Sequence, residues 1–192
     1  MMMESLVLRC RSYRSFDESK PISKETMTDL VDLARRTSSG LNKQPLRYRV
    51  LTDPADLAKM LGNCRMGSAL TDLKLPPENG KPTGFILMFT DAKAESPEFL
   101  ALKDVGIAAQ TILLAATELG FGGCMLASFD PARLCADFGV DPDRYTPVLA
   151  IALGTPAERA ILTDIREGSV RYYRDAAGNH CVPKRGLDEI LI

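Results

Sequence analysis

The stretch that decides the fold is Asp104–Leu119, which reads DVGIAAQTILLAATEL and is followed by Gly120. Apolar residues recur in it with helical spacing, and one face is formed by Val105, Ala108, Ala109, Ile112, Ala115, Ala116 and Leu119. Ile107, Leu113 and Leu114 leave no clean polar side. A helix that is apolar nearly all round is buried on all sides. The sequence therefore predicts a helix at the centre of the fold or at a subunit interface.

Shorter elements are predicted on both sides of this helix. Cap residues, apolar periodicity and short apolar runs predict helices over 4–10, 22–36, 53–62 and from Asp130-Pro131 onward, and strands over 48–52, 85–89 and 148–153, with an extended tail over 168–192. The proline- and glycine-rich residues 66–84 read as a loop or lid, and Gly122-Gly123-Cys124 as a tight connection. Strands that alternate with helices predict an α/β or α+β chain, and we favour a mixed β-sheet flanked by helices in a single domain, 1–192.

Composition narrows the class of protein. The chain has 192 residues and a net charge of −1, which argues against a nucleic-acid partner. Five cysteines, with no Cys-x-x-Cys pair, fit reduced thiols in the cytoplasm better than disulfides or a metal site. The N-terminus lacks the basic region of a signal peptide, and we expect no membrane-spanning segment.

Two polar turns bracket the helix predicted over 22–36. The first, Arg11–Phe16, is rich in cations, and the second, Asn42–Pro45, carries two amides. Arginine forms bidentate hydrogen bonds with phosphate, and amide side chains offer donors and acceptors to the edge of a planar ring. Together the turns indicate a bound flavin, although a cation cluster is also typical of a solvated face.

The sequence offers no clear acid–base or nucleophilic residue. The one histidine, His180, follows Gly178-Asn179, so we expect a solvent-facing loop residue. Cys124 stands among glycines, where a small apolar side chain is the simpler interpretation. This absence favours a reaction carried by a cofactor, with the protein supplying position and electrostatics.

The chain resembles the nitroreductase family of flavin mononucleotide (FMN) enzymes almost from end to end. Residues 10–16, Cys-Arg-Ser-Tyr-Arg-Ser-Phe, are similar to the family's first motif, Asn-Arg-Ser-Tyr-Arg-Arg-Phe. Residues 34–45 are similar to its Ala-Pro-Ser-x-x-Asn-x-Gln-Pro turn, 104–120 to its central helix, and 122–124 and 182–185 to later motifs. The order and spacing of these segments carry the resemblance.

The resemblance implies an α+β fold and an intertwined homodimer with flavins at the subunit interface. It implies that Arg11, Ser12 and Arg14 hold the phosphate and the pyrimidine end of the ring, with Lys184 and Arg185 completing the phosphate cluster. It further implies that Ser39, Asn42 and Gln44 reach the ring edge and ribityl chain from the partner subunit. Backbone groups of Cys124, Met125 and Leu126 would line the ring.

The function implied is an FMN-dependent oxidoreductase. NADH or NADPH would give a hydride to the flavin, and a small acceptor such as a nitroaromatic or quinone would take the electrons in a ping-pong mechanism. Two alternatives remain open at this point. One is a specialised relative, such as a dehalogenase, a flavin-destroying enzyme or an azoline dehydrogenase; the other is a flavin carrier or redox sensor with little turnover.

Overall fold

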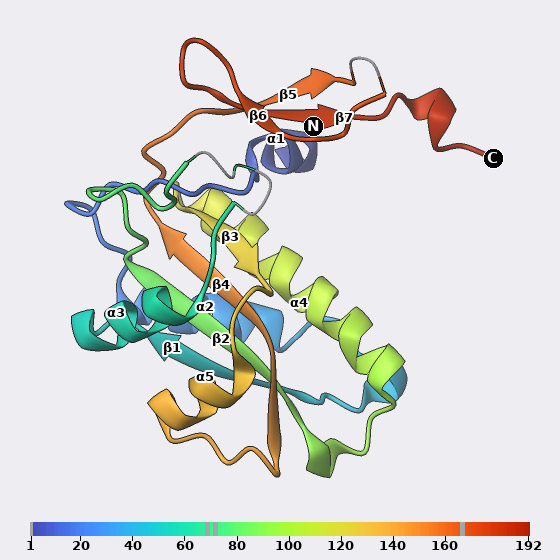
Figure 1. Cartoon of the computed structure of the whole chain (residues 1–192). Coiled ribbons are helices and arrows are strands. Elements are labelled where there is room, and N and C mark those ends of the chain that lie inside the picture. The colour runs from blue at the N-terminus through green and yellow to red at the C-terminus, as the bar shows by residue number, and fades with distance from the viewer. Residues whose placement is uncertain (1, 68–69, 71–72, 166–167) are drawn as a thin grey trace.

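The computed structural model describes residues 2–67, 70, 73–165 and 168–192, and its elements are labelled in Figure 1. In chain order these are α1 Met2–Arg9, α2 Lys24–Ala34, η1 Gly40–Asn42, β1 Leu46–Leu51, α3 Pro54–Asn63, β2 Gly84–Asp91, η2 Ala92–Ala94, α4 Glu98–Glu118, β3 Gly122–Leu126, α5 Pro131–Phe138, β4 Tyr145–Gly154, β5 Ala160–Asp164, β6 Tyr173–Arg174, β7 His180–Lys184 and η3 Leu187–Glu189. The predicted α+β class is confirmed.

Two sheets organise these elements. The main sheet has four strands in the order β1-β2-β4-β3, and its neighbouring strands pair antiparallel. The smaller sheet has the order β5-β7-β6, with β5 and β7 parallel and β6 and β7 antiparallel. The mixed pattern that we predicted is therefore found in the small sheet. In the main sheet α4 carries the chain from β2 to β3, and β4 lies between those two strands.

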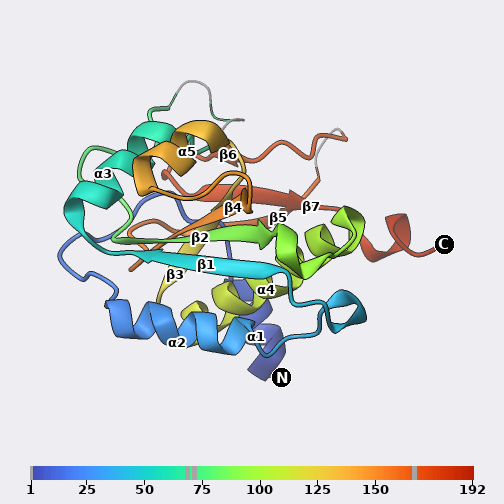
Figure 2. The same cartoon turned by 90° about the horizontal axis from the view of Figure 1, so that it is seen from below.

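The main sheet lies between two helical layers (Figure 2). Successive side chains of a strand point to opposite faces, and β2 is apolar on both. Ile86 and Met88 belong to the cluster that α2 and α4 cover, whereas Phe85, Leu87 and Phe89 belong to the cluster that α3 and α5 cover. Burial on both faces explains why 85–89 reads as a continuous apolar run.

The central helix is longer than predicted and is not buried all round. It begins at Glu98 instead of Asp104, and nine of its residues are buried, among them Ala108, Ala109 and Ile112. In the single chain, however, Phe99, Leu102 and Ile107 stay exposed along one side. By length and composition α4 could also cross a membrane, contrary to our expectation for the sequence, but its buried face packs on the sheet and α2 as a core helix does.

Three predicted helix starts are confirmed by their caps. The Ser23 hydroxyl accepts the Thr26 N–H at 3.1 Å at the start of α2. The Asp53 carboxylate accepts the Ala55 N–H at 2.9 Å, and the Asp130 carboxylate plays the same part for α5. Side-chain oxygens at these positions satisfy backbone N–H groups that have no partner inside the helix.

The prediction of a tight connection at Gly122-Gly123-Cys124 is wrong, because these residues begin β3 and pair with β4. The turn lies earlier, at Gly120, whose φ of +85° suits glycine. A side chain at Gly122 would meet the Tyr13 ring at 2.5 Å, and one at Gly123 the Ala152 carbonyl at 2.5 Å. The two glycines thus allow close packing of a strand. In the predicted lid 66–84, residues 68–69 and 71–72 lie outside the described residues, and the described part before Gly84 contains no helix.

Candidate functional site

The first motif lies against the end of the main sheet, where β3 starts. Ser12 forms a parallel bridge with Gly123, and the Tyr13 N–H donates to the Gly123 carbonyl at 3.0 Å. On the other side, the Ala157 N–H donates to the Ser15 carbonyl at 2.9 Å. These backbone bonds hold residues 12–16 between β3 and the segment that leads to the small sheet. The cations of the motif are therefore placed by a rigid backbone.

Side chains from both ends of the chain form a cationic cavity of about 230 Å³ beside this motif. The predicted site residues Arg11, Ser12, Arg14 and Lys184 line it, together with Cys10, Tyr172, His180 and Val182. Three cations and no carboxylate stand among these lining residues. The buried Nε atoms of Arg11 and Arg14 have no hydrogen-bond partner among the described residues. Since a buried donor without a partner is costly, the cavity suits an anion with several acceptor oxygens.

Arg185, also predicted for this cluster, does not line the cavity. Its guanidinium pairs with Glu189 at 2.9 Å, beyond the end of β7. Lys184 is the last residue of β7 and reaches the cavity from the small sheet. The structure thus brings together four of the five cationic and hydroxyl residues that the resemblance pointed to.

The prediction that His180 is a solvent-facing loop residue is wrong. The turn composition before it belongs to the turn at 175–178, where Gly178 N–H donates to the Asp175 carbonyl at 2.9 Å. His180 itself opens β7 and is 1% exposed. Its Nε2 lies 2.9 Å from a terminal nitrogen of Arg14, and its ring lies against the Tyr172 ring at 5.2 Å between centroids.

Burial and, next, the Arg14 guanidinium lower the pKa of His180 to about 4, with Arg174 acting in the same direction and Glu158 in the opposite one. The ring is therefore neutral at pH 7. A histidine with so low a pKa is a poor general acid or base near neutrality, because proton transfer is most effective when the pKa lies near the working pH.

The pKa of His180 predicts a pH dependence of stability. In the unfolded chain the pKa of this histidine is near 6.5, whereas in the folded protein the pKa of His180 is about 4. Between these two pH values the unfolded chain binds more protons than the folded protein, so lowering the pH favours unfolding. At 1.36 kcal/mol per pKa unit, the protein should lose about 2–3 kcal/mol between pH 7 and pH 4.5 through this group. Urea unfolding of the wild type and His180→Gln at both pH values tests this. Equal losses in the two proteins would contradict it.

Glu158 is a residue beside the candidate site that could not be picked out from the sequence. Its buried carboxylate accepts the backbone N–H groups of Arg14 and Ser15, the latter at 3.1 Å, and binds the Arg174 guanidinium. It thereby ties the first motif to the small sheet. The carboxylate of Glu158 therefore binds Arg174 and backbone N–H groups, and it does not neutralise the guanidinium of Arg14. Nothing in the sequence around Glu158 signals this role.

Cys124, Met125 and Leu126 lie in β3, at the edge of the main sheet. The Gly123 carbonyl faces outward, where it accepts the Tyr13 N–H, and the period of two along a strand places the backbone of Met125 on the same outer edge. Cys124 is 3% exposed, and burial raises the pKa of its thiol. The thiol is therefore not a thiolate nucleophile at neutral pH.

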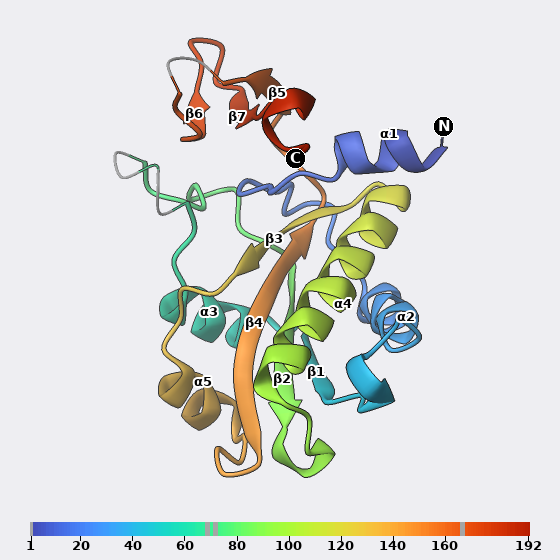
Figure 3. The same ribbon diagram turned by 90° about the vertical axis from the view of Figure 1, so that its right-hand side faces the viewer.

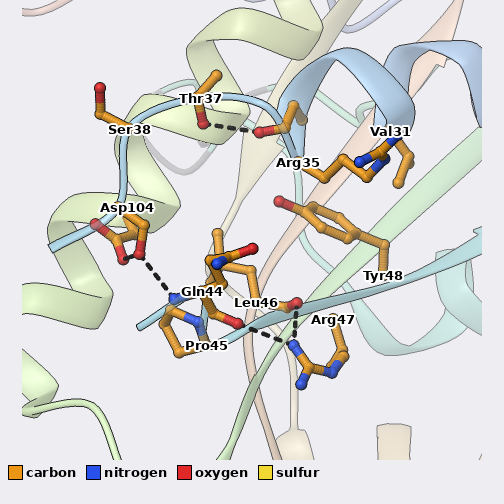
Figure 4. Close-up of a pocket in the computed structure, with 12 residues that line it drawn as sticks. Val31, Arg35, Thr37, Ser38, Gln44, Pro45, Leu46, Arg47, Tyr48 and Asp104 are labelled. Atoms are coloured by element: carbon orange, nitrogen blue, oxygen red, sulfur yellow. Dashed lines mark hydrogen bonds between the residues drawn. The ribbon is translucent and has the colours of Figure 1, made fainter. Parts of the chain in front are cut away.

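The second polar turn forms a different cavity, of about 340 Å³ (Figure 4). Ser39 and Gln44 line it, whereas Asn42 does not. The buried carboxylate of Asp104 fixes the turn by accepting the Ser39 hydroxyl at 2.6 Å and the Gly40 N–H at 2.9 Å. The Gln44 N–H in turn donates to the Ser39 hydroxyl oxygen at 2.9 Å.

Backbone strain marks the same turn. Leu41, Asn42 and Gln44 have φ values of +52°, +52° and +49°, a region that residues other than glycine seldom occupy. Such strain persists only where surrounding structure holds it, and it concentrates at functional sites. Asp104 supplies part of that support, and the sequence had suggested for it only a place at the start of a helix.

The segments that carry the two parts of the predicted site lie toward different ends of α4 (Figure 3). The segment between α2 and β1, which carries the polar turn, lies beside the N-terminal part of this helix, whereas α1 and the small sheet, next to which the residues of the cationic cavity lie, are found toward its C-terminal end. The turn is bonded to Asp104 of α4, whereas the Gln110 amide of the same helix donates to Cys10 of the cationic cavity, so the two groups of residues are held at different turns of α4.

Comparisons of the sequence and of the structure with known proteins both find nitroreductases. Residues 7–155 match the model of the nitroreductase family. "Putative NAD(P)H nitroreductase YdgI" of Bacillus subtilis is 24% identical over 77% of this chain and 85% of its own. The Cr(VI) reductase of Pseudomonas sp. strain G-1 is 27% identical over 82% of this chain and 68% of its own. A Desulfovibrio desulfuricans structure in complex with FMN is 26% identical, with a TM-score of 0.74 over 98% of this chain and 94% of that one.

Proposed function

The chain belongs to the nitroreductase family of flavin oxidoreductases, and on this premise we propose that it binds FMN and passes a hydride from NADH or NADPH, by way of the flavin, to a small-molecule acceptor. The observation that carries the proposal is the cationic cavity. It gathers Arg11, Ser12, Arg14 and Lys184 from the two ends of the chain around buried guanidinium atoms that lack partners. A terminal phosphate provides the charge and the acceptor oxygens that such atoms need.

The protein's share of the mechanism is binding and orientation. FMN, when bound, supplies the hydride chemistry. Arg11, Arg14 and Lys184 would hold its phosphate and the pyrimidine end of its ring, and outward-facing backbone groups of β3 would contact the ring. Neither Cys124, whose thiol pKa is raised, nor His180, whose pKa is lowered to about 4, is poised for proton transfer at pH 7. We therefore assign no reacting side chain, and the pocket contributes geometry and the exclusion of water.

We further propose that the working form is a homodimer in which each flavin site is shared. The polar turn at Ser39–Gln44 contains residues with positive φ values and is fixed by hydrogen bonds to Asp104, as a ligand-binding turn can be. It lies toward the N-terminal part of α4, whereas α1 and the small sheet beside the cationic cavity lie toward the C-terminal end. A two-fold axis beside α4 would bring the turn of one chain toward the cavity of the other. The exposed apolar side of α4, with Phe99, Leu102 and Ile107, would then be buried in the interface.

The acceptor is proposed only as a class. The relatives named above are called "Putative NAD(P)H nitroreductase" and "CR(VI) reductase", and these names point to chemically different acceptors. A single open stacking face that serves nicotinamide and acceptor in turn would give ping-pong kinetics. Oxidation of NADPH with a quinone or a nitroaromatic acceptor, compared with the same concentration of free FMN, tests the proposal. A rate no higher than that of free flavin would favour a carrier or sensor.

The cofactor released by heating is expected to be FMN alone. The cationic cavity suits a terminal phosphate, and the sequence contains nothing that resembles an adenine site. Chromatography of the supernatant after heat denaturation, against FMN and FAD standards, checks this. Recovery of FAD as the only flavin would contradict it.

Cys124→Ser should keep turnover within about tenfold of the wild type, measured on protein confirmed to be loaded with flavin. The reason is that only the backbone at this position is assigned to the ring, and the thiol stays protonated in its buried place. A general acid or base typically contributes about 10²–10⁴-fold. A thousandfold loss with intact flavin content would therefore reveal a reacting group at Cys124.

A further inference from the structure

The side chain of Arg14 is held by neutral groups. It is 8% exposed, and one terminal nitrogen lies 2.9 Å from His180 Nε2 and 3.2 Å from the Ser12 carbonyl, to which it donates. Its guanidinium carbon lies 4.7 Å from the centroid of the Tyr172 ring. An imidazole, a carbonyl and an aromatic ring thus surround the charge. This arrangement differs from the usual pairing of a buried arginine with a carboxylate.

The contact also fixes the state of His180. A guanidinium can only donate hydrogen bonds, so Nε2 must accept, and the proton of the neutral ring must be on Nδ1. A protonated ring would place a second cation against Arg14. The carboxylate nearest in the network, Glu158, binds the backbone N–H of Arg14 and the Arg174 guanidinium instead.

We propose that His180 is a positioning residue that holds the Arg14 guanidinium ready for the anionic ligand of the cationic cavity while leaving its positive charge uncancelled. The proposal rests on the FMN site proposed above. A carboxylate in place of His180 would fix Arg14 equally well, but it would compete with the ligand for the same charge. A neutral acceptor lowers the ordering cost of a long side chain without that competition.

Titration of FMN into apoprotein, followed by flavin fluorescence, tests the proposal with matched variants. His180→Gln can place an amide oxygen near the Nε2 position, whereas His180→Asn carries the same amide but is one methylene too short. Ordering of one long side chain is worth about 0.5–1.5 kcal/mol, so His180→Asn should weaken FMN binding about 2- to 12-fold. His180→Gln should stay within about twofold of the wild type.

A double-mutant cycle with Arg14→Ala separates positioning from a general loss of structure. If His180 acts through Arg14, adding His180→Asn to Arg14→Ala should cause no further loss of affinity. A purely additive cycle, or equal losses in His180→Gln and His180→Asn, would overturn the proposal. A wild-type protein that does not bind FMN would instead overturn the proposed function.

A spectroscopic measurement keeps the test independent of whether the variants fold. His180 is the only histidine in the chain, so ¹⁵N-histidine NMR reports on this ring alone. At pH 7 the spectrum should show a protonated Nδ1 and an unprotonated Nε2. A ring protonated at Nε2, or an imidazolium, would show that His180 does not accept a hydrogen bond from Arg14 and would overturn the proposal.

Discussion

Replacing Leu102 and Ile107 together by glutamate is expected to convert the protein to monomers and to abolish FMN binding in the same step. Both residues lie on the exposed side of α4, at 51% and 42% exposure in the single chain. In a two-fold dimer through this face the double variant would bury four carboxylates, and the effective cost of burying an unpaired ion is several kcal/mol each. In the proposed dimer the polar turn of one chain completes the flavin site of the other, so a monomer would retain only half of each site.

Light scattering and flavin titration on the same samples measure the two effects. We expect the wild type to be a dimer at micromolar concentration, with an interface above the standard size of roughly 1,600 Å², and the variant to bind FMN more than about 100-fold more weakly. The matched control is Ala132→Glu/Ala136→Glu in α5, on the opposite face of the sheet, where both alanines are exposed. A flavin-loaded monomer in the wild type or the variant would contradict the shared site.

Replacement of Arg11 or Arg14 by alanine should each weaken FMN binding about 10- to 150-fold. Each arginine would lose a charge-assisted hydrogen bond, worth about 1.5–3 kcal/mol, and about 1.4 kcal/mol corresponds to a factor of ten. Lys184→Ala should have a smaller effect, because Lys184 is a single flexible ammonium at the exposed end of β7.

Arg185→Ala provides the control, because Arg185 pairs with Glu189 outside the cavity. Fluorescence titration of the apoproteins measures all four affinities, and thermal unfolding of each apoprotein shows whether the variant is folded. Wild-type affinity in both arginine variants would mean that the phosphate site lies elsewhere. A loss in Arg185→Ala as large as in Arg14→Ala would mean that the cavity described here does not define the site.

Helix caps and one buried strand were read correctly from local signals in the sequence. The cap residues Ser23, Asp53 and Asp130 predicted three helix starts correctly. Their side-chain oxygens accept backbone N–H groups of the first helical turn, so the signal depends only on residues close in sequence. The apolar run at 85–89 predicted a buried strand, because a strand that is covered on both faces is apolar at every position. The motif at Arg11–Phe16 and the residues at 182–185 pointed to one anionic ligand, and their order along the chain carried the resemblance to the family.

What the sequence alone could not supply were the contacts between segments far apart in the chain. His180 looked like a turn residue, because the glycine and asparagine before it are local signals, whereas its burial depends on Arg14 and Tyr172. The roles of Glu158 and Asp104 could not be predicted, because each carboxylate accepts hydrogen bonds from backbone N–H groups that are far away in the sequence. Gly122 and Gly123 suggested a turn, but the close approach of Tyr13 and β4 makes them part of a strand. The sequence by itself determined the α-helices and the strands β1, β2 and β4, because these depend on neighbours along the chain. Only the tertiary structure decided which charges stay unpaired and which residues hold them in place, because those depend on the packing of the whole fold.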